Sequence, residues 1–539
     1  MPLPRNSRLC SGAILFASLI SFSGAIAAGQ VSVTTYHNDN YRTGWNNQET
    51  ALTPASVAGA SFGALHHVVL DDQVDAQPLV VPGVNIAAGT HKGVHDVAYV
   101  VTEGNTVYAI DANSGAILLK PNFGTPVPWP LGCNNNGPNV GINSTPVIDA
   151  STNTLYVIVY TNETNGPIYR IHALDIGSLT DKTAPQVIAA SHALNDGSTF
   201  SFNAKYQRQR PGLLLANGNV YAGFGSFCDY SADHSRGWLL GWVKDSLTPL
   251  AANQVFDIQP NAPDNFFLSS IWMSGYGLAA DDSGNIMFTT GNSDYSGTTY
   301  DGVTNIQESV VKVAPNLGTI TGIFTPSNQS QLDNWDADFG SGGVMILPDQ
   351  PGTRPHMGVA AGKFGTMYLM NVDHLGGYST TSDNVLQKLP VGGCWCGPSY
   401  FVDSDGKASV VSSGDRVAKV WKLTTSPKPA FSKGPITPVI PSGEWPGFFT
   451  SVSSNGTSSP VLWAVSRPLQ GSAKAATYLF AFDPDNLTNG KMTQLFRGLA
   501  GNWPNYWGAA NTVPVVANGK VFVASYQQLV IFGLKPPKR

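Results

Sequence analysis

The chain has 539 residues, of which 42% are hydrophobic and only 12% are charged. Soluble domains average about 25% charged residues, so this composition excludes an intrinsically disordered chain and a charge-rich coiled coil. The formal net charge is −5 and no run of Lys and Arg exceeds two residues, so we expect no nucleic-acid partner.

The first segment has the features of a secretory signal peptide. Arg5 and Arg8 supply positive charge, the apolar run 13–20 is too short to span a bilayer, and 25–27 is a small-residue cleavage site. We therefore expect residues 1–27 to be removed and residues 28–539 to form one exported domain, secreted or periplasmic. No other stretch is long and apolar enough for a transmembrane segment.

The cysteines that remain after the leader are Cys133, Cys228, Cys394 and Cys396. An oxidising compartment allows two disulfides, in any of three pairings. We expect Cys133 to pair with Cys228, and Cys394 and Cys396 to be too close for a relaxed crosslink. The motif for covalent haem attachment, Cys-x-x-Cys-His, does not occur.

One strand pattern recurs eight times along the mature chain. Each copy has a short apolar strand, a Gly or Asn turn, a Val/Tyr-rich strand, and a third strand that often ends in Ala-x-Asp. Asn217-Gly218 and Asn518-Gly519 are typical hairpin turns, because Asn and Gly tolerate positive φ. The copies begin near Gln77, Ser144, Arg210, Gly275, Gly342, Pro398, Ser459 and Thr512.

This repeat predicts an all-β fold with little helix, in which the strands bury both faces by packing radially. We expect a single eight-bladed β-propeller of four-stranded antiparallel blades, with seven blades as the alternative. The last copy ends one strand short, so an N-terminal strand, either 31–36 or 65–70, is expected to close the ring.

Some third strands carry a motif of a known family. Ala109-x-Asp111-x-x-x-Gly115 resembles the docking repeat of the quinoprotein alcohol dehydrogenase-like propellers, which contain pyrroloquinoline quinone (PQQ) repeats. Partial copies end at Asp175 and Asp483, and Leu119 stands where the family has a tryptophan. The resemblance implies a site for PQQ and a Ca²⁺ or lanthanide ion, both bound on the propeller axis.

Three segments resemble the family's site in the family's chain order. Gly291-Asn292-Ser293 is similar to the loop with the metal-binding Asn. Asp333–Asp338 resembles an Asp-x-Trp-Asp-x-Asp segment, which implies Asp336 as catalytic base and metal ligand and Asp338 as the extra carboxylate of lanthanide-using members. Lys363, in a Gly-Lys-Phe-Gly turn, resembles the basic residue that contacts the quinone.

Two family features are missing. The family's Gly-Gly-Glu falls near 225–229, where Asp229 is the substitute metal ligand that we assign, and the family's vicinal disulfide is absent. A structural alternative also stands for the matched residues, because Asp336 and Asp338 can cap a turn before Gly340.

Two further groups of residues are candidates for a role at the site. Five tryptophans near strand starts are expected either to form an aromatic floor for a quinone or sugar ring or to pack between blades. They are Trp129, Trp272, Trp445, Trp503 and Trp507. No histidines have zinc-type spacing, and His234, near Asp229 and Asp233, is the one closest to a candidate residue.

These observations lead to three hypotheses. The first is an exported oxidoreductase that uses PQQ and a Ca²⁺-like ion on an alcohol, polyol or sugar and passes electrons to a separate acceptor. The second is a non-catalytic propeller scaffold that binds a protein or polysaccharide in the cell envelope or outside the cell. The third is a propeller hydrolase or lyase.

Overall fold

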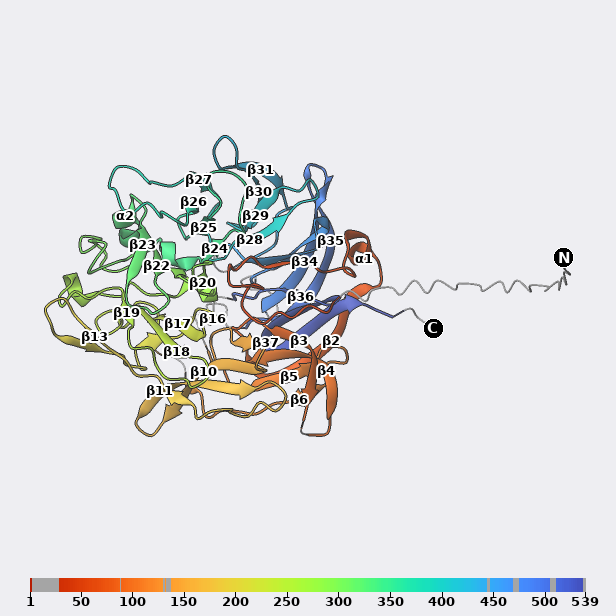
Figure 1. Cartoon of the computed structure of the whole chain (residues 1–539), viewed down its shortest axis with the longest axis horizontal. Coiled ribbons are helices and arrows are strands. Elements are labelled where there is room, and N and C mark those ends of the chain that lie inside the picture. Colours follow the sequence, from red (N-terminus) through yellow and green to blue (C-terminus); the bar gives the residue numbers. More distant parts are fainter. Residues whose placement is uncertain are drawn as a thin grey trace.

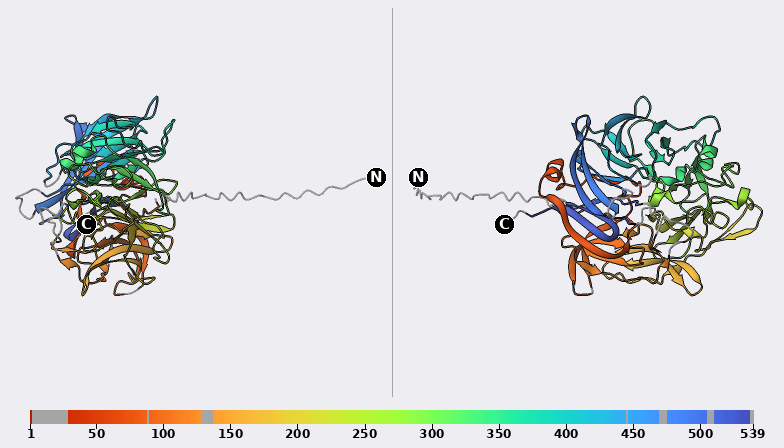
Figure 2. Two further views of the ribbon diagram at one scale, coloured as in Figure 1. Left: turned by 90° about the vertical axis from the view of Figure 1, so that its left-hand side faces the viewer. Right: turned by 180° about the vertical axis from the view of Figure 1, so that it is seen from behind.

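The computed structural model describes Met1 and residues 29–536, except 88, 129–130, 132–136, 444–445, 469–474 and 505–509. Eight main sheets follow one another in chain order round a ring, from red at the first blade to blue at the last (Figure 1). The expected eight-bladed β-propeller is confirmed. Seen from the side, the ring is a disc that is thinner than it is wide (Figure 2).

The first four blades run from residue 79 to residue 324. Blade 1 is β3 (Leu79–Ile86), β4 (Gly93–Val101), β5 (Val107–Asp111) and β6 (Ile117–Leu119). Blade 2 is β9 (Val147–Asp149), β10 (Thr154–Glu163), β11 (Gly166–Asp175) and β12 (Gln186–Val187). Blade 3 is β16 (Leu214–Ala216), β17 (Asn219–Ser226), β18 (Trp238–Val243) and β19 (Gln254–Val255), with β15 (Gln207–Arg208) also on β17. Blade 4 is β20 (Ala279–Ala280), β21 (Ile286–Thr289), β22 (Val310–Val313) and β23 (Ile320–Phe324).

The other four blades complete the ring. Blade 5 is β24 (Val344–Ile346), β25 (Met357–Ala361), β26 (Thr366–Asn371) and β27 (Gln387–Pro390). Blade 6 is β28 (Ser399–Val402), β29 (Ala408–Ser412), β30 (Lys419–Thr424) and β31 (Ala430–Ile436). Blade 7 is β32 (Phe449–Asn455), β33 (Ser458–Val465), β34 (Ala476–Thr488) and β35 (Lys491–Asn502), with β1 (Trp45–Asn46) parallel to β32. Blade 8 is β36 (Val515–Ala517), β37 (Lys520–Leu534) and β2 (Phe62–Gln73).

Few elements lie outside the blades. Two short hairpins pair β7 (Val127–Pro128) with β8 (Asn139–Val140) and β13 (Ser191–Ala193) with β14 (Thr199–Ser201). The helices of the described residues are α1 (Pro54–Ala58), α2 (Gln329–Asn334) and three single 3₁₀ turns, η1 (Pro263–Asn265), η2 (Met273–Gly275) and η3 (Phe339–Ser341). The low helix content expected from the sequence is therefore confirmed.

The ring closes where the two ends of the chain meet. β2 pairs antiparallel with β37, from Phe62 opposite Leu534 to Gln73 opposite Tyr526. Of the two candidate closing strands, 65–70 lies in β2 and does close the ring. The other candidate contributes a single bridge, from Val33 to Val80 in blade 1.

The core lies between the blades rather than inside any one of them. Eight large clusters of buried side chains each unite two neighbouring blades, because strands with apolar residues on both faces need a partner on each side. One cluster joins Phe522 and Leu529 of blade 8 to Val80 and Ala98 of blade 1, so the last blade packs against the first.

An N-terminal strap, residues 33–46, lies inside the ring and contacts the first strand of each blade or a residue next to it. In these blades the first strand is the innermost, as β20, β24 and β28 show in Figure 1. The contacts run in blade order: Val33 with Val80, Thr34 with Ile148, Asn40 with Leu215, Asn40 with Ala280, Tyr41 with Ile346, Thr43 with Tyr400, Gly44 with Val452 and Asn46 with Val516. The strap therefore ties all eight blades together.

Arg42 fixes the middle of the strap. Its side chain is fully buried and donates to the main-chain oxygens of Leu278 (2.6 Å), Tyr36 (2.8 Å) and Leu213 (3.3 Å). Tyr276 packs edge-on against the rings of Tyr36 and His37 and donates to the Arg42 carbonyl oxygen at 2.7 Å. These contacts link the strap to the residues that lead into blade 4.

The buried imidazole of His37 makes stability depend on pH. Burial lowers the pKa of His37 to about 4 from an ordinary value near 6.5. The unfolded chain therefore takes up a proton below pH 6.5 that the folded chain takes up only near pH 4, and this costs about 3 kcal/mol of stability between those pH values. Urea unfolding at pH 7 and at pH 4 should show that the free energy of unfolding falls less between these pH values for His37→Phe than for the wild type. Equal losses in the two proteins would contradict this assignment.

Candidate functional site

The candidate residues come from loops at one end of blades 3, 4 and 5. Asp229, Asn292 and Lys363 each follow the second strand of their blade, β17, β21 and β25. Asp336 and Asp338 lie in the connection that enters blade 5. In an antiparallel blade these two kinds of loop lie at the same end of the strands, so their side chains can meet.

Lys363 joins the two aspartates of the blade 5 entry loop. Its Nζ lies 2.7 Å from Asp336 Oδ1 and 2.5 Å from Asp338 Oδ2. The side chain of Asp338 is 4% exposed, whereas that of Asp336 is 62% exposed. Burial lowers the pKa of Lys363, but the charges of Asp338 and Asp336 outweigh burial and raise that pKa above its ordinary value. The lysine is therefore a fixed positive charge with one buried and one accessible carboxylate.

Asn292 approaches the same carboxylates from blade 4. Its backbone N–H donates to Asp338 Oδ1 at 2.7 Å. The preceding residue must be small, because a Cβ on Gly291 would lie 2.9 Å from both Asp338 Oδ1 and Trp272 Nε1. The side chain of Asp338 thus binds a neighbouring blade and Lys363 instead of capping its own turn.

Asp229 completes the group from blade 3. The side-chain amide of Asn292 donates to Asp229 Oδ2 at 3.3 Å. Burial and the negative charges of Asp338 and Asp336 raise the pKa of Asp229 to about 6. The structure therefore brings together all five residues that the sequence singled out: Asp229, Asn292, Asp336, Asp338 and Lys363.

The indole rings of Trp272 and Trp395 lie beside the ammonium group of Lys363. Trp272 and Trp395 are half-buried, and their ring centroids lie 5.1 Å apart at an interplanar angle of 70°. Lys363 Nζ lies 4.7 Å from the ring centroid of Trp395 and 5.5 Å from that of Trp272. Only Trp272 was among the expected floor residues. Trp503 is buried, and Trp129, Trp445 and Trp507 lie outside the described residues.

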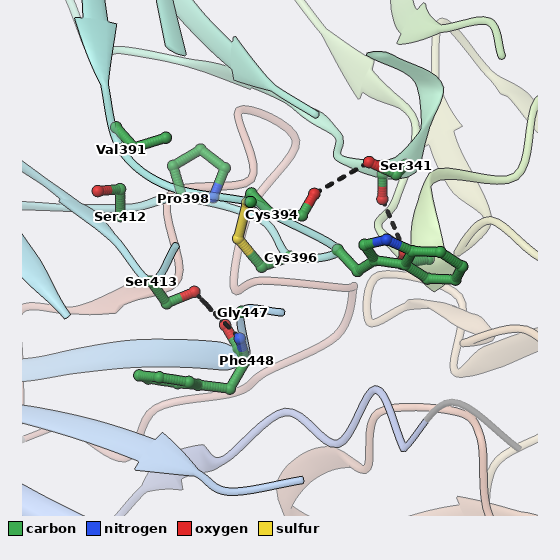
Figure 3. Close-up of a disulfide and its surroundings, with 12 residues drawn as sticks. Ser341, Val391, Cys394, Cys396, Pro398, Ser412, Ser413, Gly447 and Phe448 are labelled. Atoms are coloured by element: carbon green, nitrogen blue, oxygen red, sulfur yellow. Dashed lines mark hydrogen bonds between the residues drawn. A yellow bond between two sulfur atoms is a disulfide. The ribbon is translucent and has the colours of Figure 1, made fainter. Parts of the chain in front are cut away.

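A disulfide between Cys394 and Cys396 holds the loop that carries Trp395 (Figure 3). The expectation that these cysteines are too close for a relaxed crosslink was wrong, because the residue between them lets the Cα atoms lie 5.0 Å apart, inside the normal range. Ser341, close to Asp338 in sequence, donates to the Cys394 carbonyl oxygen at 2.9 Å. Cys228 is also disulfide-bonded, and Cys133, its expected partner, lies outside the described residues.

Two buried acids beneath the site were missed by the sequence reasoning. Asp333 Oδ1 accepts from the backbone N–H of Ser293 at 2.9 Å, and Glu308 Oε2 accepts from that of Phe339 at 2.5 Å. Burial raises the pKa of both carboxyl groups well above their ordinary values. They hold the loops of Asn292 and Asp338 in place. Asp333 belongs to the recognised segment, but nothing in the sequence connects Glu308 with it.

Other candidates do not join the site. His234 is exposed, lies 2.7 Å from Asp233 and packs on Tyr206. Within the described ranges, no group of three or more His, Cys, Asp or Glu side chains is arranged to hold a metal ion. Asp336 and Asp338 are instead bridged by the Lys363 ammonium group. No helix in the described part of the chain is long and apolar enough to cross a membrane.

The fold is similar to that of solved quinohemoprotein and methanol dehydrogenases. The quinohemoprotein alcohol dehydrogenase from Comamonas testosteroni superimposes with a TM-score of 0.59 at 13% identity, over 95% of this chain and 82% of that one. A europium-containing methanol dehydrogenase superimposes with a TM-score of 0.58 at 12% identity, over 93% and 98%. At these identities the likeness concerns the fold alone. The chain matches no protein-family model and no curated protein.

Proposed function

We propose that this protein is an exported oxidoreductase that oxidises an alcohol, polyol or sugar with PQQ and a Ca²⁺ or lanthanide ion. The observation that carries the proposal is the meeting of Asp229, Asn292, Asp336, Asp338 and Lys363, with two tryptophan rings beside the lysine. The structural neighbours support it, since they include an alcohol dehydrogenase and a europium-containing methanol dehydrogenase.

The residues present fit such a cofactor in their chemistry. Carboxylate and amide oxygens are the ligands that hard cations take, and here they come from Asp229, Asn292, Asp336 and Asp338. The Lys363 ammonium group already lies between two of these carboxylates, so this group of residues stabilises one positive charge. Trp272 and Trp395 offer flat faces for a ring system, and Lys363 offers a donor for its oxygens.

Asp336 is the residue of this chain best placed to take the proton of the substrate hydroxyl group. Partial desolvation and the charge of Asp338 raise its pKa above the ordinary value, while Lys363 limits the rise. A raised pKa makes the carboxylate a better proton acceptor. When bound, PQQ supplies the acceptor for the hydride that leaves the substrate carbon, and the ion polarises the quinone. The substrate thus loses one proton and one hydride and becomes a carbonyl compound.

Reconstitution tests the proposal directly. Purified protein is mixed with PQQ and either Ca²⁺ or La³⁺, and dye reduction is followed across a panel of alcohols, polyols and sugars. We expect the quinone absorbance to remain with the protein after gel filtration and the dye to be reduced. A protein that neither retains the quinone nor reduces the dye would instead be a non-catalytic binding propeller. With either ion the proposed reaction needs a separate electron acceptor, and in this assay the dye is that acceptor.

Export is part of the same proposal. The leader features of residues 1–27 support removal before Ala28. N-terminal sequencing of the protein recovered from the periplasm or medium of the expressing cells should begin near Ala28.

A further inference from the structure

The exposed aromatic side chains of this protein are not scattered over its surface. Among the described residues, the exposed ones are Tyr230 (74%), Tyr295 (50%), Trp335 (61%) and Phe364 (45%). Tyr230 follows Asp229, Trp335 precedes Asp336 and Phe364 follows Lys363. Tyr295 lies three residues after Asn292. Every one is thus next to, or close in sequence to, a residue of the candidate site.

These four side chains, here called the aromatic rim, also lie near one another or near the site's charges. The rings of Trp335 and Phe364 are 6.2 Å apart between centroids. Desolvation and the charges of Asp229 and Asp336 raise the pKa of Tyr295, so its hydroxyl group lies within electrostatic reach of both carboxylates. The rim residues belong to loops of blades 3, 4 and 5, and each lies close in sequence to a residue of the candidate site, whereas Trp272 and Trp395 pack beside Lys363.

Exposed aromatic rings at one place indicate a ligand that covers them. The other described aromatic side chains are buried or half-buried, as expected when burying a large side chain is worth about 1.5–3 kcal/mol. Exposed rings that gather in the loops of one site mark a binding surface rather than chance exposure. A methanol-sized alcohol bound at Asp336 would leave this rim uncovered.

The charges around the rim favour a neutral ligand with many hydroxyl groups. Asp229 and Asp336 offer acceptors for hydroxyl donors, and the positive charge of Lys363 is already shared between Asp336 and Asp338. An anionic ligand that brings no cation with it would be repelled by this excess of carboxylates. Sugar rings present an apolar C–H face to an aromatic ring and hydroxyl donors to a carboxylate, which matches loops in which exposed rings stand next to carboxylates in sequence.

We propose that the aromatic rim binds the sugar units of an oligosaccharide. Its specific consequence, which rests on the proposed function, is that the hydroxyl group presented to Asp336 belongs to a saccharide of more than one unit. Binding at the rim forms no covalent bond and needs neither quinone nor metal ion, so it can be measured on the protein alone.

Calorimetric titration without added quinone or ion tests the rim. The probes are cellohexaose, maltohexaose, xylohexaose and, as the single unit, glucose. We expect at least one hexasaccharide to bind about tenfold more tightly than glucose, and Trp335→Ala and Phe364→Ala each to weaken that binding about tenfold. Trp335→Phe should keep most of the affinity. Val187→Ala, which removes an equally exposed apolar side chain from β12, should keep all of it.

Two results would overturn the proposal. One is that no hexasaccharide binds more tightly than glucose, and the other is that Trp335→Ala binds as well as the wild type. These results are separate from the reconstitution experiment. Saccharide binding without dye reduction would support the binding role of the rim and reject the oxidoreductase. Dye reduction without saccharide binding would support the oxidoreductase and reject the binding role of the rim.

Discussion

Replacing Asp336 by Asn should lower the turnover of the reconstituted enzyme by about a thousandfold. Of the two carboxylates that Lys363 is seen to contact, the change removes the exposed one, and general-base catalysis by a positioned side chain is worth about 10²–10⁴-fold. The amide has nearly the same shape, so Lys363 keeps Asp338 as its partner and the fold should be unchanged. Dye reduction under substrate saturation measures the effect.

A matched control separates this effect from a general loss of charge. Asp405→Asn changes an aspartate with 72% side-chain exposure on a blade 6 hairpin and should leave turnover unchanged. If Asp336→Asn retains the quinone absorbance but loses turnover, Asp336 acts as the base. If the absorbance is lost as well, Asp336 serves chiefly as a ligand, and if turnover stays within threefold of the wild type, the assignment is wrong.

Replacing Lys363 by Met should destabilise the propeller by about 3–5 kcal/mol, because it leaves the buried carboxylate of Asp338 without its compensating charge. The loss should appear as a lower midpoint of urea unfolding with an unchanged slope. The double variant with Asp338→Asn should recover most of the loss, since it removes the uncompensated charge as well.

An exposed lysine provides the comparison for Lys363. Lys433 lies exposed on β31, and Lys433→Met should change stability by less than about 0.5 kcal/mol. A midpoint for Lys363→Met equal to that of Lys433→Met would mean that Asp338 is compensated elsewhere. A double variant less stable than Lys363→Met would mean that Asp338 stabilises the fold through its bond to Asn292.

The fold could be predicted because its information is local and repeated. Apolar strands bounded by Gly and Asn recur in every blade, and third strands such as the one ending at Asp111 close with the carboxylate accepting the backbone N–H of Ser114 at 2.7 Å. The closing strand could not be chosen between 31–36 and 65–70, because both are short apolar segments. Only the long-range pairing with β37 distinguishes them.

Only those residues of the candidate site that belong to a recognisable sequence motif could be predicted. Asn292, Asp336 and Lys363 stand in recognisable segments. The buried acids that hold their loops act instead through hydrogen bonds to distant main-chain N–H groups, as Glu308 does to that of Phe339. A hydrogen bond between two residues far apart in the chain produces no repeating pattern in the sequence from which it could be predicted. The same holds for Trp395, which enters the site because a Cys394–Cys396 bond shapes its loop.

The strap makes the order of biosynthesis matter. Residues 33–46 are synthesised before any blade, yet Asn46 pairs with Val516, which is made 470 residues later. During translation these residues must therefore remain unpaired, or pair only with the blades already made, until almost the whole polypeptide has emerged. Contacts of such large sequence separation slow folding and lengthen the exposure of unpaired strands to aggregation. A nascent chain of this protein that stalls before its last blade would thus leave its earliest segment unable to complete the ring.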